Sequence, residues 1–512
     1  MRIAEGLKGL DYNVIQGNPE LSVEDVVYDS RKAGAGCVFV CMTGSRVDSH
    51  RFIGQVTESG CKALVVEREL TEDEREKLPK DVLVIRVENS RQALAFLSAA
   101  RFGHPAGKMV CIGITGTKGK TTTTYMMKAV LEAAGKKVGL IGTAGVVIGD
   151  KTYPTRNTTP ESYELHKYFS QMVEEGCQYM IMEVSSQGLK MHRVDGIRFD
   201  YGLFTNISRD HIGPDEHRDF EEYLYYKSQL LNQCRVGLMN RDDEHFHQVM
   251  RLVADSGKSH IYTFGLESEA DFMAKGIDYV SEPDFVGVDF RVEGKGRAGE
   301  KTGRQIGEGV HTLEVRMNIP GRFNVYNALA AVSVCSFLNL PEESICHGLE
   351  HLYVNGRMEI VHTSGRCTVI VDYAHNAVSM ESLLLTLREY HPRRLVCVFG
   401  CGGNRSKDRR YSMGEIGGKL ADFCILTADN SRFEKVEDIL ADIRSSIEKT
   451  GGAFIEIPDR REAIRYSIVH AQPGDMIAVI GKGHEDYQEI EGVRYPFLDR
   501  QVIEEVIKEL EG

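Results

Sequence analysis

Short apolar runs, each followed by a segment rich in glycine or charge, recur along most of the chain. In the amino-terminal part they lie at residues 37–42 and 63–66, and a helical pattern follows at 90–102. Gly103-His104-Pro105 interrupts that helix, because glycine and proline are strong local breakers. We therefore expect a first small α/β domain over residues 1–105.

The pattern changes after Met109. Residues 110–114 form an apolar run that predicts a buried strand, followed by a glycine-rich turn and a helix that ends near Ala134. Similar strand–turn–helix units predict a mostly parallel sheet. Residues 265–318 alternate instead, which predicts antiparallel strands. This central domain, with a sheet like that of P-loop ATPases, is expected over residues 106–345.

A new series of strands and helices occupies the remainder, residues 346–512. Apolar runs at 368–371, 395–399, 423–427 and 476–480 alternate with helical segments. Such alternation predicts a doubly wound, Rossmann-like domain. The expected fold class is therefore α/β, with three domains.

Composition is compatible with this organisation. A chain of 512 residues corresponds to roughly three domains at ~150 residues each. The formal net charge of −13 argues against a general nucleic-acid binder. The 12 cysteines are dispersed, which favours a reducing compartment. No stretch approaches the ~20 apolar residues of a membrane span, and the start of the chain lacks signal-peptide character. We expect a cytoplasmic protein.

The turn after the strand at 110–114 has the composition of a phosphate-binding loop. It reads Thr-Gly-Thr-Lys-Gly-Lys-Thr-Thr over residues 115–122. Glycines allow backbone N–H groups to face phosphates, and the following helix N-terminus favours negative charge. Lys120 can reach the outer phosphates of a nucleotide, and the Thr121 hydroxyl can bind Mg²⁺. The loop predicts ATP binding.

This loop resembles that of the Mur ligase family, which usually reads GTNGKTT; Lys118 replaces the asparagine. The family also includes folylpolyglutamate synthetases. The resemblance implies that the ATP-binding residues include Gly116, Thr117, Lys118, Gly119, Lys120, Thr121 and Thr122.

Candidate metal ligands lie in two later parts of the chain. Glu183 comes at the end of an apolar strand, where a carboxylate can meet nucleotide-bound Mg²⁺; its segment resembles the family's EVSSHGL, with Gln187 in place of histidine. The resemblance further implies that His211 binds a second metal and that Lys227 is carbamylated by CO₂. A carbamate is an oxygen-donor anion suited to a hard cation, unlike a lysine ammonium. Lys120, Lys227 and His211 are the expected catalytic residues, with Thr121, Glu183, His211 and Lys227 as metal ligands.

These groups fit one reaction. Transfer of the ATP γ-phosphoryl group to a carboxylate gives an acyl phosphate, which an amine attacks with loss of phosphate. Two metals and a lysine would neutralise the charge that develops on the phosphoryl group and on the acceptor. The chain is thus expected to be an ADP-forming, ATP-dependent, amide-forming ligase.

Two more regions resemble nucleotide-binding segments of the family. Residues 319–328 resemble PGxFNVYNALAA, and residues 356–359 and 372–376 resemble GRME and DYAHN. The resemblance implies ATP contacts from Asn324, Asn327, Arg357, His375 and Asn376.

The amino-terminal domain and the segment 157–160 resemble substrate-binding patterns of the family. The motif at residues 28–31 resembles a uridine-nucleotide site, and NTTP at 157–160 resembles a muramoyl-peptide site in which Met191 replaces a frequent glutamine. The implied ligand is UDP-N-acetylmuramoyl-L-alanyl-D-glutamate, bound by Tyr28, Ser30, Ser45, Arg46, Val47, Asn157, Thr158, Thr159, Ser185, Met191 and Arg193.

Three carboxy-terminal segments, GCGGNR at 400–405, DNSR at 429–432 and GKGHE at 481–485, resemble the family members that add meso-diaminopimelate. Diaminopimelate carries one carboxylate more than lysine, so its selection requires an extra cation. Guanidinium groups bind carboxylates in a bidentate way, and an unpaired arginine would repel the lysine ammonium. The expected amino-acid site comprises Arg405, Asp429, Asn430, Ser431, Arg432, Gly481 and Glu485.

Alternatives remain at this point. One is a lysine-adding ligase of the same family, and another is a folylpolyglutamate synthetase. The departures at Lys118, Gln187, Met191 and Ser431 also leave open a nucleotide-binding scaffold without catalysis. We expect a monomer that binds no nucleic acid.

Overall fold

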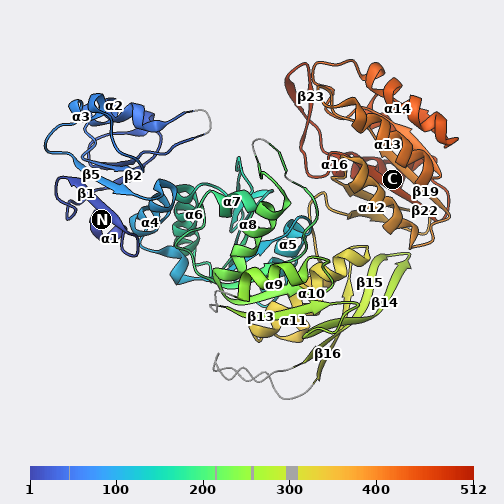
Figure 1. Cartoon of the computed structure of the whole chain (residues 1–512). Helices are drawn as coiled ribbons and strands as arrows, with labels where there is room; N and C mark the ends of the chain where they lie inside the picture. The colour runs from blue at the N-terminus through green and yellow to red at the C-terminus, as the bar shows by residue number, and fades with distance from the viewer. Residues whose placement is uncertain (45–46, 211, 214–215, 255–258, 296–309, 512) are drawn as a thin grey trace. The chain divides into compact units, whose positions relative to one another are not determined.

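The computed structural model describes residues 1–44, 47–210, 212–213, 216–254, 259–295 and 310–511. The chain divides into two compact units, Met1–Ala270 and Asp271–Gly512. Figure 1 colours the chain by residue number. Each unit is described by itself. Among the described helices, none has the combination of length and apolar character that crossing a bilayer would require.

The first unit begins with a five-stranded sheet in the order β1-β5-β4-β3-β2. Its strands pair in parallel except for β1 and β5. The strands are β1 (Tyr12–Gln16), β2 (Asp25–Val27), β3 (Cys37–Val40), β4 (Ala63–Val66) and β5 (Leu83–Val87). The helices are α1 (Ile3–Gly6), α2 (Ile53–Glu58), α3 (Glu72–Glu76) and α4 (Ser90–Arg101), with 3-10 turns η1 (Ser30–Lys32), η2 (Ser49–Phe52) and η3 (Pro105–Lys108).

A second sheet of the first unit carries the phosphate loop. Within this unit its strand order is β13-β12-β11-β6-β10-β7-β8-β9, parallel from β13 to β7 and antiparallel beyond. The strands are β6 (Val110–Thr115), β7 (Val138–Gly142), β8 (Gly145–Ile148), β9 (Lys151–Tyr153), β10 (Tyr179–Glu183), β11 (Phe199–Phe204), β12 (Cys234–Asn240) and β13 (His260–Gly265). The helices are α5 (Lys120–Ala133), α6 (Ser162–Glu174), α7 (Ser186–Lys190), α8 (Phe220–Asn232) and α9 (Phe246–Ala254).

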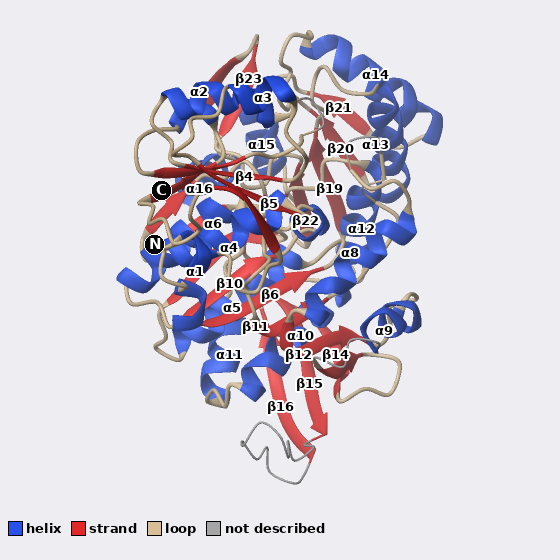
Figure 2. Cartoon of the chain, turned by 60° about the vertical axis from the view of Figure 1, so that its left-hand side comes forward, coloured by secondary structure: helices blue, strands red, loops and turns tan. Residues whose placement is uncertain are grey.

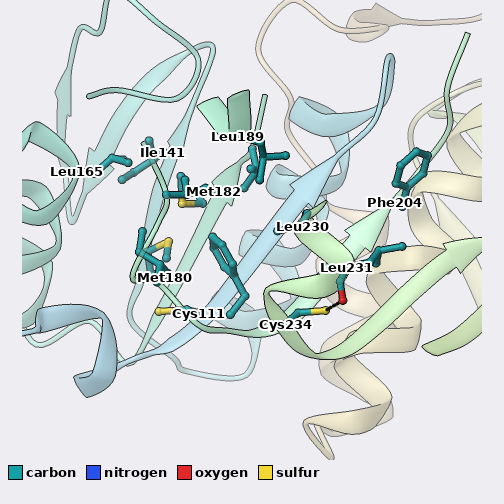
Figure 3. Close-up of a cluster of buried hydrophobic side chains, with 14 of the residues drawn as sticks. Cys111, Ile141, Leu165, Met180, Met182, Leu189, Phe204, Leu230, Leu231 and Cys234 are labelled. Carbon is teal, nitrogen blue, oxygen red and sulfur yellow. Dashed lines mark hydrogen bonds between the residues drawn. The ribbon is translucent and has the colours of Figure 1, made fainter. Parts of the chain in front are cut away.

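The core of this sheet is apolar because its parallel strands are covered by helices. Met180 and Met182 of β10 lie in one buried cluster with Leu165 of α6 and Leu230 of α8 (Figure 3). The helices are thereby fixed against the sheet. As a result, the loops at the carboxyl ends of β6, β7, β10 and β11 are held on a rigid scaffold.

The second unit begins with three strands, β14 (Phe272–Glu282), β15 (Phe285–Lys295) and β16 (Val310–Met317), followed by helices α10 (Arg322–Phe337) and α11 (Glu342–Glu350). Both strand pairs are antiparallel. This confirms the antiparallel pairing predicted from the alternating pattern.

The second unit also contains a six-stranded sheet in the order β17-β18-β22-β19-β20-β21, parallel except for β17. Its strands β19, β20, β21 and β22 are labelled in Figure 2. A separate hairpin joins β23 and β24. The strands are β17 (Glu359–Thr363), β18 (Cys367–Asp372), β19 (Arg394–Phe399), β20 (Phe423–Leu426), β21 (Phe454–Glu456), β22 (Asp475–Ile480), β23 (Tyr487–Ile490) and β24 (Val493–Pro496). The helices are α12 (Ala377–Arg388), α13 (Lys407–Leu420), α14 (Val436–Thr450), α15 (Arg460–Val469) and α16 (Asp499–Glu511).

The predicted α/β fold class is confirmed, with a small amino-terminal sheet, a mostly parallel central sheet and a Rossmann-like carboxy-terminal sheet. The domain boundaries at 105 and 345 stay predictions.

Candidate active site

The phosphate loop lies between β6 and α5, as the sequence predicts. A side chain at Gly116 would meet Thr205 Oγ1 at 2.0 Å, so this position requires glycine. Gly119 has a φ of 85°, a conformation that glycine adopts without strain. The Lys118 N–H donates to Asn206 Oδ1 at 2.9 Å. The residues just beyond β11 thus hold the loop in shape.

Lys120 begins helix α5 and folds back over this loop. Its Nζ donates to the carbonyl oxygens of Gly116 at 2.8 Å and of Thr117 at 3.2 Å. The ammonium therefore lies against the loop that leads into the amino terminus of α5. Both the lysine and the helix terminus favour a bound anion.

Glu183 is buried at the carboxyl end of β10, with 1% of its surface exposed. Its Oε1 accepts a hydrogen bond from the Thr121 hydroxyl at 2.9 Å. A carboxylate beside a threonine hydroxyl is a suitable ligand pair for Mg²⁺. The phosphate loop and the predicted metal ligand therefore meet as expected.

Thr143, which was not predicted, follows β7 and also holds the Glu183 carboxylate. Its N–H donates to Glu183 Oε1 at 3.0 Å, and its hydroxyl donates to Oε2 at 3.1 Å. Gly142 leaves room for this contact, since a Cβ there would meet Glu183 Oε1 at 2.3 Å. Thr143 follows β7, whose carboxyl end lies beside that of β10, and no pattern in the sequence indicates this pairing.

Replacing Thr143 by valine should raise the Mg²⁺ concentration needed for half-maximal activity by about tenfold, because groups that orient a metal ligand contribute this much to metal affinity. A Mg²⁺ titration of initial rates measures the effect. Thr152→Val, on the exposed strand β9, is the matched control and should leave the titration unchanged. An unchanged titration for Thr143→Val would remove Thr143 from the metal-binding role.

Lys227 is buried on α8, with 2% of its surface exposed. Its Nζ donates to the Gly116 carbonyl oxygen at 2.7 Å and lies 4.9 Å from the centre of the Tyr223 ring. Burial, followed by the nearby Lys120 ammonium, lowers the pKa of Lys227 well below its usual value. A neutral amine is the form that reacts with CO₂, so the environment suits a carbamate.

Tyr223 also connects α8 to the phosphate loop. Its hydroxyl lies 3.0 Å from the Thr117 hydroxyl, which in turn accepts the Ser208 N–H at 3.0 Å. This contact was not predicted, because a tyrosine four residues before Lys227 has no motif of its own. It fixes α8, and with it Lys227, against the loop.

Three predicted site residues, Ser45, Arg46 and His211, lie outside the described residues. Among the described residues, there is no group of three or more His, Cys, Asp or Glu side chains that could hold a metal by itself. A metal at Glu183 would therefore take further ligands from Thr121 and the nucleotide.

Four residues predicted for the muramoyl-peptide acceptor, Thr158, Thr159, Ser185 and Arg193, are connected to Glu183 through Thr159 or Thr143. The Thr159 hydroxyl donates to the Glu183 carbonyl oxygen at 2.9 Å and accepts the Ser185 N–H at 2.9 Å. Arg193 donates to the Thr159 carbonyl oxygen at 3.1 Å. The Thr158 hydroxyl lies 3.1 Å from that of Thr143. Asn157 is exposed and Met191 is half-buried.

In the amino-terminal sheet region, Tyr28 and Ser30 lie just after β2. The Tyr28 hydroxyl donates to both carboxylate oxygens of Glu164 in α6, at 2.9 and 2.8 Å. Ser30 begins a 3-10 turn that Asp29 caps. Val47 is exposed. The Tyr28 hydroxyl thus connects this region to α6. The part of Tyr28 that remains for contact with a ligand is its ring.

In the second unit, Asn324 and Asn327 lie in the first turns of α10 and are buried. Asn324 Nδ2 donates to the Pro320 carbonyl oxygen at 2.7 Å, and Asn327 Nδ2 donates to Asn324 Oδ1 at 3.0 Å. The two amides form a chain that holds the start of the helix. Their predicted contact with adenine stays a prediction.

Arg357, His375 and Asn376 lie around Tyr373. The Arg357 guanidinium carbon is 4.8 Å from the centre of the Tyr373 ring, and the His375 ring centre is 4.7 Å from it. Asn376 caps α12 by accepting the Ser379 N–H at 3.0 Å. The structure brings these residues together, although Asn376 has a structural role of its own.

The amino-acid site predicted from three separate segments forms one cluster in the second unit. Asn430 Nδ2 donates to Glu485 Oε2 at 2.8 Å, and a Cβ at Gly481 would lie 3.0 Å from Asp429 Oδ2. Arg432 Nη1 donates to the Gly403 carbonyl oxygen at 2.7 Å. These contacts link the loops after β19, β20 and β22.

The expectation of an unpaired arginine is wrong for Arg432. Its Nε lies 3.4 Å from Glu489 Oε2 on β23. The sequence did not reveal this neighbour, because it depends on the bridge between Arg432 and Ile490. Arg405 is exposed and Ser431 is buried. Arg405 is therefore the more accessible of the two predicted cations.

Arg460, which was not predicted, connects the starts of two of these loops. It is fully buried and makes a two-pronged ion pair with Asp499, at 2.7 Å for each bond. Its other hydrogen bonds reach the carbonyl oxygens of Ala428 at 3.3 Å and Ile480 at 3.0 Å. Each of these residues immediately precedes a predicted recognition segment.

Comparison with known proteins agrees with this geometry. Three family models match successive parts of the chain: "Mur ligase family, catalytic domain" at 22–102, "Mur ligase middle domain" at 114–335, and "Mur ligase, glutamate ligase domain" at 356–483. A UDP-N-acetylmuramoyl-L-alanyl-D-glutamate–2,6-diaminopimelate ligase from Caldanaerobacter subterraneus subsp. tengcongensis is 40% identical and covers 100% of both chains. The chain belongs to the Mur ligase family.

Other Mur ligases support this membership. A protein of the same name from Clostridium perfringens is 39% identical over 98% of each chain. A solved structure titled UDP-N-acetylmuramoyl-L-alanyl-D-glutamate–2,6-diaminopimelate ligase superposes with a TM-score of 0.75 at 26% identity, covering 100% of this chain and 99% of that one. As a Mur ligase, the chain is an ATP-dependent, amide-forming ligase.

A folate enzyme has a similar fold. Folylpolyglutamate synthase of Mycobacterium tuberculosis superposes with a TM-score of 0.57 at 18% identity, covering 77% of this chain and 92% of that chain. At this identity the likeness concerns the fold alone.

Proposed function

We propose that this Mur ligase joins meso-diaminopimelate to UDP-N-acetylmuramoyl-L-alanyl-D-glutamate, with ATP converted to ADP and phosphate, as a step in peptidoglycan precursor synthesis. The names of its full-length relatives support this substrate pair. The observation that carries the chemistry is the meeting of Thr121, Glu183 and Lys227 around one phosphate loop.

In this proposal, Lys120 and the loop bind the outer phosphates of ATP, and Thr121 and Glu183 hold Mg²⁺. The metal would neutralise phosphate charge and polarise the transferring phosphoryl group. The acceptor carboxylate attacks that group, ADP leaves, and the amine of diaminopimelate then displaces phosphate from the acyl phosphate. Lys227, carbamylated by CO₂, would provide an anionic oxygen ligand.

The acceptor would bind through Thr158, Thr159, Ser185 and Arg193. Thr159 bonds to the Glu183 backbone and links Ser185 and Arg193 to it, and Thr158 lies beside Thr143, which holds the Glu183 carboxylate. The UDP moiety would bind near Tyr28 and Ser30, and the amino acid near Arg405, Arg432 and Glu485. A folylpolyglutamate synthetase is disfavoured, because the chain matches diaminopimelate ligases over its whole length.

We also propose a cytoplasmic location. All twelve cysteines are free thiols, and eleven of them are buried, as expected in a reducing compartment. The monomeric state stays a prediction.

The purified protein should release phosphate from ATP only when both the UDP-muramoyl dipeptide and a diamino acid are present. Parallel assays with diaminopimelate, lysine and ornithine should give turnover with diaminopimelate far above that with the other two. Equal turnover with all three would refute the amino-acid assignment. No turnover with any of them would favour a scaffold that binds nucleotide without catalysis.

A further inference from the structure

Lys482 is a completely buried cation inside the amino-acid cluster, with 0% of its side chain exposed. In the sequence it lies between Gly481 and Glu485, but no role was predicted for it. Its Nζ donates to Asn430 Oδ1 at 3.1 Å and to Glu485 Oε2 at 3.2 Å, and lies 4.0 Å from Asp429 Oδ1.

A buried ammonium is costly unless its charge is compensated. Here the compensation comes from two carboxylates on two loops, since Asp429 follows β20 and Glu485 follows β22. Lys482 also lies 5.3 Å from the centre of the Tyr487 ring. Its ammonium is therefore an internal counter-ion of the cluster that the two loops form.

Glu485 is the link between this counter-ion and a ligand. Its side chain is 20% exposed, so part of it can reach an amino acid. Both of the hydrogen bonds to its carboxylate that the described residues provide, from Asn430 and Lys482, end on Oε2. Oε1 is thus the atom available to a ligand's ammonium, and Lys482 sets how much negative charge that atom presents.

We propose that Lys482 is a specificity-determining residue, which compensates Asp429 and Glu485 so that the site prefers an amino acid with a zwitterionic distal end over one with an ammonium alone. This inference rests on the proposed function. Lys482 acts through Glu485 and does not itself touch the substrate, since its side chain is fully buried.

The preference follows from charge. The distal end of diaminopimelate carries an ammonium and a carboxylate and has no net charge, whereas the distal end of lysine carries +1. Removing a buried cation from the cluster therefore strengthens the attraction for lysine by a direct Coulomb effect. The effect on diaminopimelate is smaller, because attraction and repulsion of its two groups oppose each other.

The test is the ratio of kcat/KM for diaminopimelate to kcat/KM for lysine, measured by phosphate release. Lys482→Met should lower this ratio by about tenfold, the size of a single poorly screened charge interaction. Lys435→Met is the matched control, because it removes the same charge from an exposed position in the same unit. It should leave the ratio unchanged.

A second pair of variants tests the same role if Lys482→Met alone fails to fold. The net charge of Asp429, Lys482 and Glu485 is −1 in the native protein, −2 in Lys482→Met, 0 in Glu485→Gln and −1 in the double variant. The ratio should rise in Glu485→Gln and fall again in Glu485→Gln/Lys482→Met. An equal ratio in these two variants would overturn the role of Lys482.

Different results would refute the proposed substrate and the proposed role of Lys482. If the native protein shows no preference for diaminopimelate over lysine, the proposed substrate is wrong. If the native protein prefers diaminopimelate but folded Lys482→Met keeps the native ratio, Lys482 is a structural residue and the proposed function stands.

Discussion

Replacing Lys227 by methionine should lower kcat by about a thousandfold, the size expected when a charge-stabilising group is removed from an active site. Methionine preserves much of the side-chain volume at this buried position, so the loss would reflect chemistry more than packing. The native amine lies against the Gly116 carbonyl oxygen, and burial lowers its pKa. The lowered pKa increases the neutral fraction of this amine, which is the form that reacts with CO₂.

The carbamate can be tested separately from the side chain. Enzyme prepared and assayed without bicarbonate should lose activity and regain it when bicarbonate is added, and ¹³C-labelled bicarbonate should give a carbamate NMR signal that is missing in Lys227→Met. Lys128→Met, at a partly exposed position of α5 where the ammonium pairs with Glu132, should behave like the native protein. Full activity of Lys227→Met would refute the role of this lysine.

Replacing Arg432 by alanine should raise the KM for diaminopimelate by roughly 10- to 100-fold, as expected for loss of a charged hydrogen bond. The KM for ATP should change little. Initial rates at varied concentrations of each substrate measure both values. Because Arg432 already lies 3.4 Å from Glu489, part of its charge is compensated before the amino acid binds.

Arg444→Ala offers a comparison for this prediction. Arg444 lies on α14 and pairs with Glu456 at 3.1 Å, with 44% of its side chain exposed. Its loss should leave both KM values unchanged. Equal increases in the KM for diaminopimelate and for ATP in Arg432→Ala would remove Arg432 from the amino-acid site.

The sequence predicted the parts of the site that have local signatures. The phosphate loop follows from a strand, a glycine-rich turn and a helix, and Glu183 follows from its place at the end of an apolar run. Both predictions rest on properties of neighbouring residues. The contact between Thr121 and Glu183 agrees with them.

Other features depend on which strands and loops become neighbours. Thr143 reaches Glu183 because β7 pairs with β10, and Glu489 reaches Arg432 because the hairpin of β23 lies beside the loop after β20. Lys482 is buried by residues from two loops. Periodicity along the chain carries no information about such pairings, so these contacts could not be predicted.

The central claim is that Thr121, Glu183 and Lys227 surround the cations and phosphates of one bound nucleotide. A crystal structure with Mn²⁺ and a non-hydrolysable ATP analogue tests it directly, because the anomalous signal of Mn²⁺ locates the ions. The account predicts one ion bound by Thr121 Oγ1 and the Glu183 carboxylate, and a second bound by modified Lys227. Nucleotide bound at the loop with no ion at Glu183 or at Lys227 would contradict it.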